Sequence, residues 1–348
     1  MDSVTQAALG AAVAVAVVGK HSSIKKAAIW GAVIGTLPDL DVFIDYGDDL
    51  SEMVRHRGES HSLVYQTLIA PLLAWLICRW HQQQQHFKAW WLAVWLVLVT
   101  HSLLDTFTTY GTQLLLPFSN YPFALESIFV IDPLYTLPLL AGLVYAWRQP
   151  EKGLAANRIG LICSSGYLLW SVLAQQWVIH QVTQQGADAS QSPYWLLVQP
   201  TALNTLVWRI IKVDEHGYQE GFYALSDGRR AVTFRQHYFP EQTEQLRAFT
   251  DAERLTRFSH GFVGYFQHDA LFTMADLRMG MQGNYAFEFT LACQQHDGVK
   301  STQLQQTRKS YQMVEMWLWA ARRFLQQETG LTEAELRSEN PCNTNSGR

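Results

Sequence analysis

Aspartate and histidine side chains gather in two short stretches of this sequence, each beside a long apolar segment. The first stretch, residues 35–62, reads GTLPDLDVFIDYGDDLSEMVRHRGESHS, and the second, residues 101–105, reads HSLLD. Carboxylate oxygens and imidazole nitrogens are donors that bind divalent cations in proteins, Zn²⁺ foremost and Mn²⁺ as a second choice. The sequence therefore predicts a metal site, with the candidate ligands Asp39, Asp41, His56, His61, His101 and Asp105.

His101 and Asp105 are spaced i, i+4, so a helix places both side chains on one face, where they can bind one cation. A single histidine on a helix is more often a structural residue. This pair, however, lies at the end of an apolar run, where ionisable groups are costly and usually functional. We favour metal ligation for both residues.

The first stretch offers two further pairs of donors. Asp39 and Asp41 resemble a carboxylate pair that coordinates one metal or bridges two, and the alternative is a helix cap followed by a solvated acidic loop. His56 and His61 are five residues apart, and Gly58 between them permits a tight bend. The spacing is thus compatible with both histidines binding metal.

Arg57 and Glu59 lie between the two histidines and are the candidate catalytic residues. The planar guanidinium of Arg57 suits a phosphate group, and a salt bridge to Asp39 or Asp41 explains the arginine equally well. Glu59, or an aspartate that the metal does not fully engage, is the candidate general base.

Long apolar runs must position these groups. The chain has 348 residues, and its first half contains six such runs, at residues 4–19, 27–37, 62–80, 89–105, 128–147 and 159–180. Several approach the ~20 residues that cross a bilayer, and the first two are shorter. A soluble all-α core is the alternative, which the charged residues between the runs disfavour. We expect a membrane all-α bundle of about six transmembrane helices.

Basic residues predict the orientation of this bundle. Alternate connections carry nearly all of the Lys and Arg residues, whereas residues 106–129 contain none. By the positive-inside rule the basic connections are cytoplasmic, so the termini and the C-terminal domain lie outside, which places the chain in a bacterial inner membrane. Asp39 follows Lys26 by 13 residues and His101 follows Lys88 by 13. Both are then at matching depth near the outer face.

The second half of the chain reads as a soluble domain of mixed charge with short alternating strands and tight turns. We expect a transmembrane metal-site domain at 1–182, a linker at 183–192, an extracytoplasmic α+β domain at 193–330 and a disordered tail at 331–348. Asn204 and Arg209 begin this outer domain, where an ordinary strand role is preferred to substrate contact.

Composition and the lack of other motifs exclude several classes of protein. The net charge is −4 and no basic stripe is present, so we expect no nucleic-acid partner. The sequence contains no G-x-S-x-G, Walker, Rossmann or H-E-x-x-H pattern in a suitable context. Four Cys are too few for a disulfide scaffold, and whether Cys293 and Cys342 pair stays open.

Several segments together carry a family resemblance: MDSVTQAALG at the start, GTLPDLD, HRGESHS, HSLLDTFTTYGTQLLLPFS and IDPL, the last at residues 131–134. They resemble the YdjM-type family, a family of unknown function whose members are inner-membrane proteins described by inference as metal-dependent hydrolases. PTALNTLVWR at 200–209 and the later YALSDG turn resemble its longer members. The resemblance covers most of the chain.

The family motifs are similar to those of zinc-dependent phospholipase C and the P1-type nucleases, which implies a phosphoesterase with a metal cluster bound by His and Asp. One position departs from the family pattern, because Gln6 stands where the family opening commonly carries His. Four consequences are open: loss of a ligand, weak coordination through the Gln6 carbonyl, a smaller number of metals, or loss of activity.

The sequence thus predicts metal-assisted hydrolysis of a phosphate ester, with an amphiphilic substrate such as a phospholipid or isoprenoid phosphate because the site lies at the membrane. The competing prediction is a non-catalytic membrane protein in which the same residues form a structural metal site or a polar network, and the outer domain binds a partner. A membrane peptidase is a third alternative.

Overall fold

The computed structural model describes residues 1–185, 195–295, 298–307 and 313–325. These form two compact units: a helical unit of residues 1–44, 55–176 and 202–205, and a sheet unit of residues 45–54, 177–201 and 206 onwards. A helical N-terminal region followed by a β-sheet domain is therefore confirmed. The predicted tail at 331–348 and most of the predicted linker lie outside the described residues, and residues 183–185 continue a helix.

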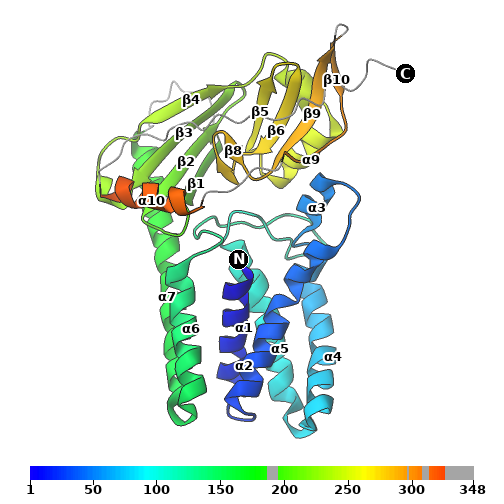
Figure 1. Cartoon of the computed structure of the whole chain (residues 1–348), viewed down its shortest axis with the longest axis vertical. Helices are drawn as coiled ribbons and strands as arrows, with labels where there is room; N and C mark the ends of the chain where they lie inside the picture. The colour runs from blue at the N-terminus through cyan, green and yellow to red at the C-terminus, as the bar shows by residue number, and fades with distance from the viewer. Residues whose placement is uncertain (186–194, 296–297, 308–312, 326–348) are drawn as a thin grey trace. The chain divides into compact units, whose positions relative to one another are not determined.

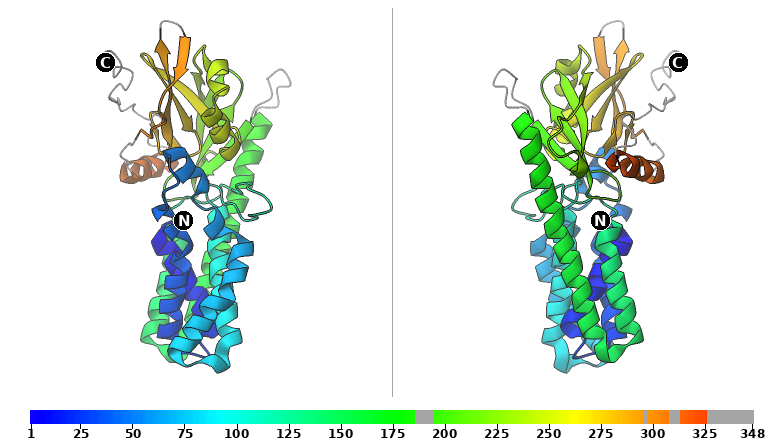
Figure 2. Two further views of the ribbon diagram at one scale, coloured as in Figure 1. Left: turned by 90° about the vertical axis from the view of Figure 1, so that its right-hand side faces the viewer. Right: turned by 90° about the vertical axis from the view of Figure 1, so that its left-hand side faces the viewer.

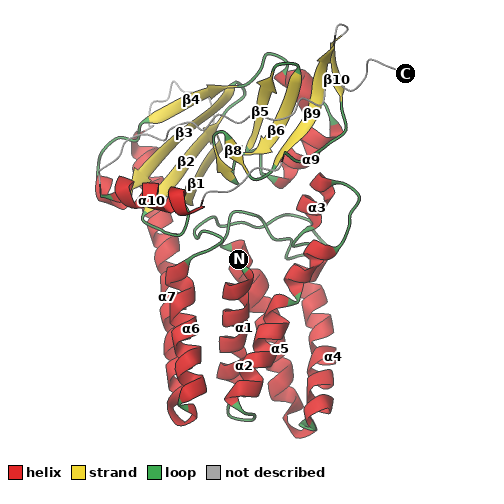
Figure 3. Cartoon of the chain, viewed as in Figure 1, coloured by secondary structure: helices red, strands yellow, loops and turns green. Residues whose placement is uncertain are grey.

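The six apolar runs all become helices, which Figure 1 labels and Figure 3 colours red. They are α1 (Ser3–Val18), α2 (Ile24–Thr36), α4 (Leu63–His81), α5 (Phe87–Thr106), α6 (Pro133–Arg148) and α7 (Pro150–Gln185). Shorter elements connect them: η1 (Pro38–Phe43), α3 (Asp49–Arg55), η2 (Glu59–His61) and η3 (Gln84–His86). Helix α1 packs against α2, α5 and α6, and the helices run side by side in the two views of Figure 2.

The prediction of about six membrane-spanning helices was too high. Among the described residues, two helical segments are long and apolar enough to cross a bilayer, Leu63–His81 and Gln84–Thr106. Helix α1 has 16 residues and α2 has 13, so at ~1.5 Å per residue both fall short of a ~30 Å hydrocarbon core. Length excludes α1 and α2, whereas α7, with 36 residues, is long enough but not apolar enough to be counted.

Large apolar side chains lie exposed on the outward faces of the helices. Leu68 on α4 is 69% exposed and Ile162 on α7 is 70% exposed. Others on α4, α6 and α7 include Leu72, Trp75, Leu137 and Leu173. A soluble protein rarely exposes so much contiguous apolar surface. The helical unit therefore presents a surface that suits hydrocarbon.

Small residues allow α1 and α2 to pack with their backbones in contact. A Cβ atom added at Gly31 would overlap the carbonyl oxygen of Gly10, and one added at Gly35 would lie 2.8 Å from the carbonyl oxygen of Gln6. Gly31 and Gly35 form a G-x-x-x-G pattern, which is typical of close helix pairs in membranes. The end of α2 is thereby held against the start of α1.

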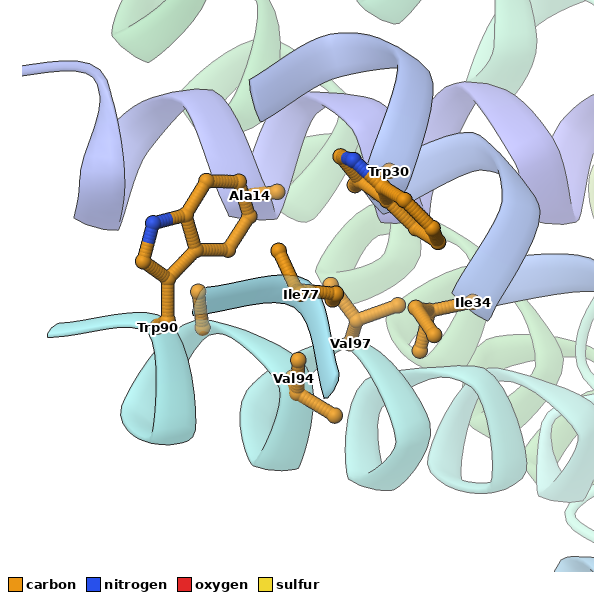
Figure 4. Close-up of a pocket in the computed structure, with 9 residues that line it drawn as sticks. Ala14, Trp30, Ile34, Ile77, Trp90, Val94 and Val97 are labelled. Atoms are coloured by element: carbon orange, nitrogen blue, oxygen red, sulfur yellow. The ribbon is translucent and has the colours of Figure 1, made fainter. Parts of the chain in front are cut away.

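An apolar cluster fills the space between α1, α2, α4 and α5, as Figure 4 shows. Trp30 and Trp90 lie on opposite sides of this cluster, and Ile34, Ile77 and Val97 also line it. Both indole N–H groups are satisfied at the edge of the cluster, Trp30 by His81 at 2.7 Å and Trp90 by Gln83 at 2.9 Å. Buried tryptophans usually find such partners, so this region is a packed core.

Residues 107–132 connect α5 to α6 and support η2. The amide of Leu63 donates to the carbonyl of Leu114 at 3.0 Å, and the amide of Gln113 donates to the carbonyl of Arg57 at 3.0 Å. The Ser62 hydroxyl donates to the carbonyl of Leu116 at 2.5 Å. These bonds hold the segment before α4 in a defined conformation.

The sheet unit contains two four-stranded antiparallel sheets (Figure 3). The first has the order β1-β2-β3-β4, with β1 (Trp195–Pro200), β2 (Val207–Val213), β3 (Gly217–Ala224) and β4 (Phe234–Tyr238). The second has the order β10-β9-β6-β5, with β5 (Val263–His268), β6 (Leu271–Asp276), β9 (Glu288–Gln295) and β10 (Gly298–Ser301). Smaller elements are η4 (Leu225–Asp227), α8 (Thr243–Arg247), α9 (Thr250–Phe258), β7 (Gly280–Met281), β8 (Asn284–Tyr285) and α10 (Met313–Phe324).

Side chains from both sheets share one core. Ile211 and Tyr218 of the first sheet pack in the same cluster as Ala275 of the second sheet and Tyr285 of β8. Arg209 on β2 is buried and donates to Glu220 on β3 at 2.6 Å. This arginine therefore has a structural role in its strand, as its sequence context indicated.

We expect Gly31→Ala to destabilise the protein by about 1–3 kcal/mol, because the new methyl group overlaps the backbone of α1 and forces the helices apart. The measurement is the midpoint of thermal unfolding of the detergent-purified protein. Gly166→Ala on α7 is the matched control, since a Cβ atom there meets nothing within 4 Å. Equal effects of the two substitutions would contradict the close packing of α1 and α2.

Candidate metal centre

Three segments of the helical unit bring the predicted ligands together. Pro38 ends α2 and starts the short helix η1, which carries Asp39, because proline cannot continue the hydrogen bonding of the preceding helix. The short helix η2 carries His61, and the last turns of α5 carry His101 and Asp105. The i, i+4 spacing places the last two side chains on one face of α5, as the sequence predicts.

Four donor atoms converge at this point. His61 Nε2 lies 3.1 Å from His101 Nε2. Asp105 Oδ2 lies 3.2 Å from His61 Nε2 and 3.5 Å from His101 Nε2. Asp39 Oδ1 lies 3.4 Å and 3.5 Å from the same two nitrogens. The four residues Asp39, His61, His101 and Asp105 each place a ligand atom within 4.8 Å of the other three.

These separations match the edges of a metal coordination sphere. Zn²⁺ binds nitrogen and carboxylate oxygen at about 2.0–2.2 Å, so neighbouring ligands of a tetrahedral ion lie about 3.3–3.6 Å apart. The five separations above span 3.1–3.5 Å. One small cation at the centre would reach all four atoms with little movement of the side chains.

The hydrogen bonds of the imidazole rings leave both Nε2 atoms directed at this centre. His101 Nδ1 lies 2.7 Å from the carbonyl oxygen of Gly35, which can only accept, so Nδ1 carries the proton. His61 Nδ1 lies 2.8 Å from the hydroxyl of Ser60. A second hydrogen bond of this kind is typical of metal-binding histidines, because it fixes the tautomer and the orientation of the ring.

The buried carboxylate of Asp105 is only half satisfied by hydrogen bonds. Its Oδ1 atom accepts from Gln6 Nε2 at 3.0 Å, pairs with the amino group of Met1 and lies 3.5 Å from Arg57 Nη2. Its Oδ2 atom, by contrast, makes no hydrogen bond among the described residues, although it is fully buried. A buried carboxylate oxygen without a partner is costly, and a cation between the four donors would satisfy it.

The electrostatics of the site favour positive charge. Burial by itself lowers the pKa of His61, but the neighbouring carboxylates of Asp105, Asp39 and Asp41 outweigh it and raise this pKa to about 9. Burial by itself raises the pKa of Asp39, but hydrogen bonds from His101 and His61 hold it well below its usual range. The cluster therefore attracts a cation, which is what a divalent metal supplies.

Asp41 and His56 lie beside this group of four, on the Nδ1 side of His61. Asp41 Oδ2 lies 3.5 Å from His61 Nδ1 and accepts hydrogen bonds from the Ser60 hydroxyl at 2.5 Å and the Arg57 amide at 3.0 Å. Its Oδ1 atom lies 2.6 Å from His56 Nδ1. The structure thus brings four of the six predicted ligands together and places the other two behind His61, where they support it.

Arg57 is buried, and its guanidinium group lies beside the carboxylate of Asp105. Its Nη1 atom donates to the Thr108 hydroxyl at 3.0 Å, and the guanidinium lies over the ring of Tyr110 at 5.0 Å. The backbone of Arg57 has φ of 63°, an unusual value for a residue with a side chain. Its side chain pairs with Asp105, whereas the sequence offered Asp39 or Asp41. Glu59 is exposed and does not belong to the group of four.

Sequence reasoning missed Ser60 and Gly35, which orient the ligands, and treated Gln6 only as a ligand position. Ser60 contacts both Asp41 and His61, and Gly35 contacts His101 through its backbone. Gln6 donates to Asp105 Oδ1 and to the carbonyl of His101, so it positions this ligand. A polar glutamine within the apolar run at 4–19 indicates a buried hydrogen-bonding role, whereas a backbone carbonyl such as that of Gly35 has no sequence pattern that predicts its partner.

The fold and this site define a membrane-associated helical protein with a buried His/Asp cluster. The chain belongs to the YdjM inner membrane protein family, whose sequence model matches residues 1–178, more than half of the chain. It is 25% identical over 288 residues to the uncharacterized protein YfhP of Bacillus subtilis, across 78% of this chain and 83% of that one.

A second relative is the inner membrane protein YbcI of Escherichia coli, 35% identical over 86 residues. That match covers 23% of this chain and 46% of YbcI, so the chain spans less than half of this relative. No solved structure matches the chain. The family resemblance seen in the sequence is therefore confirmed, and neither relative's name specifies an activity.

We expect the purified protein to bind about one equivalent of Zn²⁺ or Mn²⁺, because the four donors surround a single point. The double substitution His101→Ala, Asp105→Ala removes half of the donors and should abolish binding. The measurement is elemental analysis of the detergent-purified protein after reconstitution with metal. X-ray absorption should show about two imidazole ligands in the first coordination sphere.

His180→Ala is the control, since His180 is exposed on α7 far along the sequence from these donors. Its metal content should equal that of the unsubstituted protein. Metal that persists in the double variant, or is never bound by the unsubstituted protein, would contradict the metal centre.

Proposed function

We propose that this chain is a metal-dependent hydrolase that cleaves a phosphate ester at the outer face of the inner membrane. The observation that carries the proposal is the convergence of two imidazole nitrogens and two carboxylate oxygens at 3.1–3.5 Å. The side chain of Asp39 is 17% exposed, whereas the other three are buried, so substrate and water approach from the side of Asp39.

Each residue near the centre has a separate task in this proposal. Asp39, His61, His101 and Asp105 would hold the metal, while Ser60 and the Gly35 carbonyl would keep the imidazole rings in the binding tautomer. A bound divalent cation lowers the pKa of a coordinated water towards ~7 and polarises a phosphoryl oxygen. Asp41 and His56 support His61 from behind, and we retain them as candidates for a second metal.

Arg57 and Glu59 supply the remaining chemistry. The Nε atom of Arg57 is buried and makes no hydrogen bond among the described residues, so it can donate to an anionic group. We assign to Arg57 the stabilisation of developing negative charge. Glu59 is exposed beside His61 and is our candidate for the general base, since a carboxylate there can reach solvent and substrate.

The non-catalytic alternative also has an observation in its favour. Four protein donors that close a tetrahedron are typical of a structural zinc site, whereas a catalytic site keeps a position for water. The exposure of Asp39 and the groove beside it favour catalysis. A site with two nitrogens and two oxygens suits Zn²⁺, and Mn²⁺ is the second choice.

The proposed location of the protein rests on its family, on its apolar helices and on one cysteine of the sheet unit. The family consists of inner membrane proteins, and we propose that α4 and α5 cross the bilayer with the other helices packed against them. Cys293 in the sheet unit is disulfide-bonded, and Cys342 lies outside the described residues. Disulfides persist in oxidising compartments, which supports a sheet unit outside the cytoplasm.

We expect the metal-loaded protein to hydrolyse a chromogenic phosphate ester, tested with monoester and diester substrates. Glu59→Gln should lower kcat by about 10²–10⁴-fold with unchanged metal content, because it removes the base but no ligand. Arg57→Lys should lower kcat by about 10²-fold or more, since a lysine cannot donate in the same planar arrangement.

His180→Ala serves as the matched control and should retain full activity, because its side chain is remote from the site in sequence and exposed. A protein that holds one metal through four side chains and cleaves none of these esters would support the structural alternative and overturn the hydrolase proposal.

A further inference from the structure

An open groove of about 280 Å³ lies in the helical unit next to the metal centre. Three polar lining residues, Glu59, Ser60 and Gln66, come from η2 and the first turn of α4, and we call this part of the groove the polar end. The other lining residues include Leu37, Leu73 and Leu98. From η2 along α4 the lining thus changes from polar to apolar.

Residues that line the groove are neighbours in the sequence of the candidate metal ligands. Ser60, which lines the groove, is bonded to Asp41 and precedes His61. Pro38, another lining residue, precedes Asp39. Leu98 lies one helical turn before His101 on α5. Every segment that supplies a ligand therefore also supplies a wall of the groove.

The apolar part opens on the outward face of α4. Ile69 and Leu73 line the groove at an i, i+4 spacing, and Ile69 is 41% exposed. Its neighbours Leu68 and Leu72 are exposed on the same helix without lining the groove. From Tyr65 to Leu73 the wall extends roughly 12 Å along α4, at ~1.5 Å per residue. In a membrane this opening faces lipid.

We propose that the groove binds one hydrocarbon chain of an amphiphilic phosphate substrate and delivers its head group to the metal centre. The inference rests on the proposed function for the chemistry at the head group. The apolar wall that opens to lipid favours a hydrocarbon occupant over a polar one. The groove volume of about 280 Å³ is at the small end for ligand pockets, so the groove suits one hydrocarbon chain and not two. The polar end then orients the head group.

Specificity follows from this arrangement. For a ligand that binds from water, each methylene that enters the groove should tighten binding by about fourfold, as expected for burial of apolar surface. The gain should stop when the chain fills the groove. A soluble phosphate without a chain would reach the metal centre without this contribution.

The test is photocrosslinking of the full-length protein in nanodiscs with decyl phosphate that carries a diazirine at the end of its chain. We expect crosslinks on peptides that contain Ile69, Leu73 or Leu98, suppressed by dodecyl phosphate but not by butyl phosphate or inorganic phosphate. Ile69→Trp fills the opening and should reduce this labelling at least tenfold. Leu68→Trp, one position away on the exposed face, should leave it unchanged.

Crosslinks spread over the exposed face of α4, with equal labelling of the Ile69→Trp and Leu68→Trp variants, would overturn the proposal. So would suppression by inorganic phosphate as strong as that by dodecyl phosphate. The His101→Ala, Asp105→Ala variant separates this inference from the hydrolase proposal. Labelling of the same peptides in that variant, without metal or hydrolysis, supports a lipid-chain site whether or not the metal centre is catalytic.

Discussion

The close approach of α1 and α2 is the constraint on which the candidate site depends. Because Gly31 and Gly35 carry no side chain, the end of α2 lies directly against the first turns of α1. The Gly35 carbonyl then accepts from His101, while Gln6 on α1 donates to Asp105. The α1–α2 pair, whose backbones are in direct contact, thus orients the two candidate ligands on α5, His101 and Asp105.

The candidate site also concentrates ionisable side chains in a region that is surrounded by apolar residues. Three of its four donors are buried, and ionisable groups in such a place require partners. The partners come in layers: Arg57, Gln6 and the Met1 amino group on one oxygen of Asp105, and Ser60 and Asp41 behind His61. What these layers leave open is one position, between two nitrogens and two oxygens.

The sequence predicted much of this arrangement because donor residues stood beside apolar runs. The i, i+4 pair on α5 and the carboxylate of Asp39 are together in space, as their types and spacing indicated. The sequence could not show that Asp41 and His56 lie outside the group of four donors, because their position depends on how η1 and η2 bend. The pairing of Arg57 with Asp105 depends on the connection at 107–132, which has no periodic pattern to read.

The number of membrane spans was overestimated for a related reason. Apolar composition shows which residues avoid water, but it does not distinguish a helix that faces lipid from one enclosed by other helices. Helix α1 has mostly buried residues, and it is too short to cross a bilayer on its own. Counting apolar runs therefore counted other helices together with the two described segments that are both long and apolar enough.

The donors of the cluster come from three separate parts of the chain, η1, η2 and α5. An ion held by all three would join segments that the chain inserts at different moments of its synthesis. The ion could bind only after the three segments had assembled correctly. Its release would require those segments to separate. In such a protein, assembly of the helical bundle in the membrane would depend on the supply of metal. A shortage of the ion would then first cause a defect in assembly.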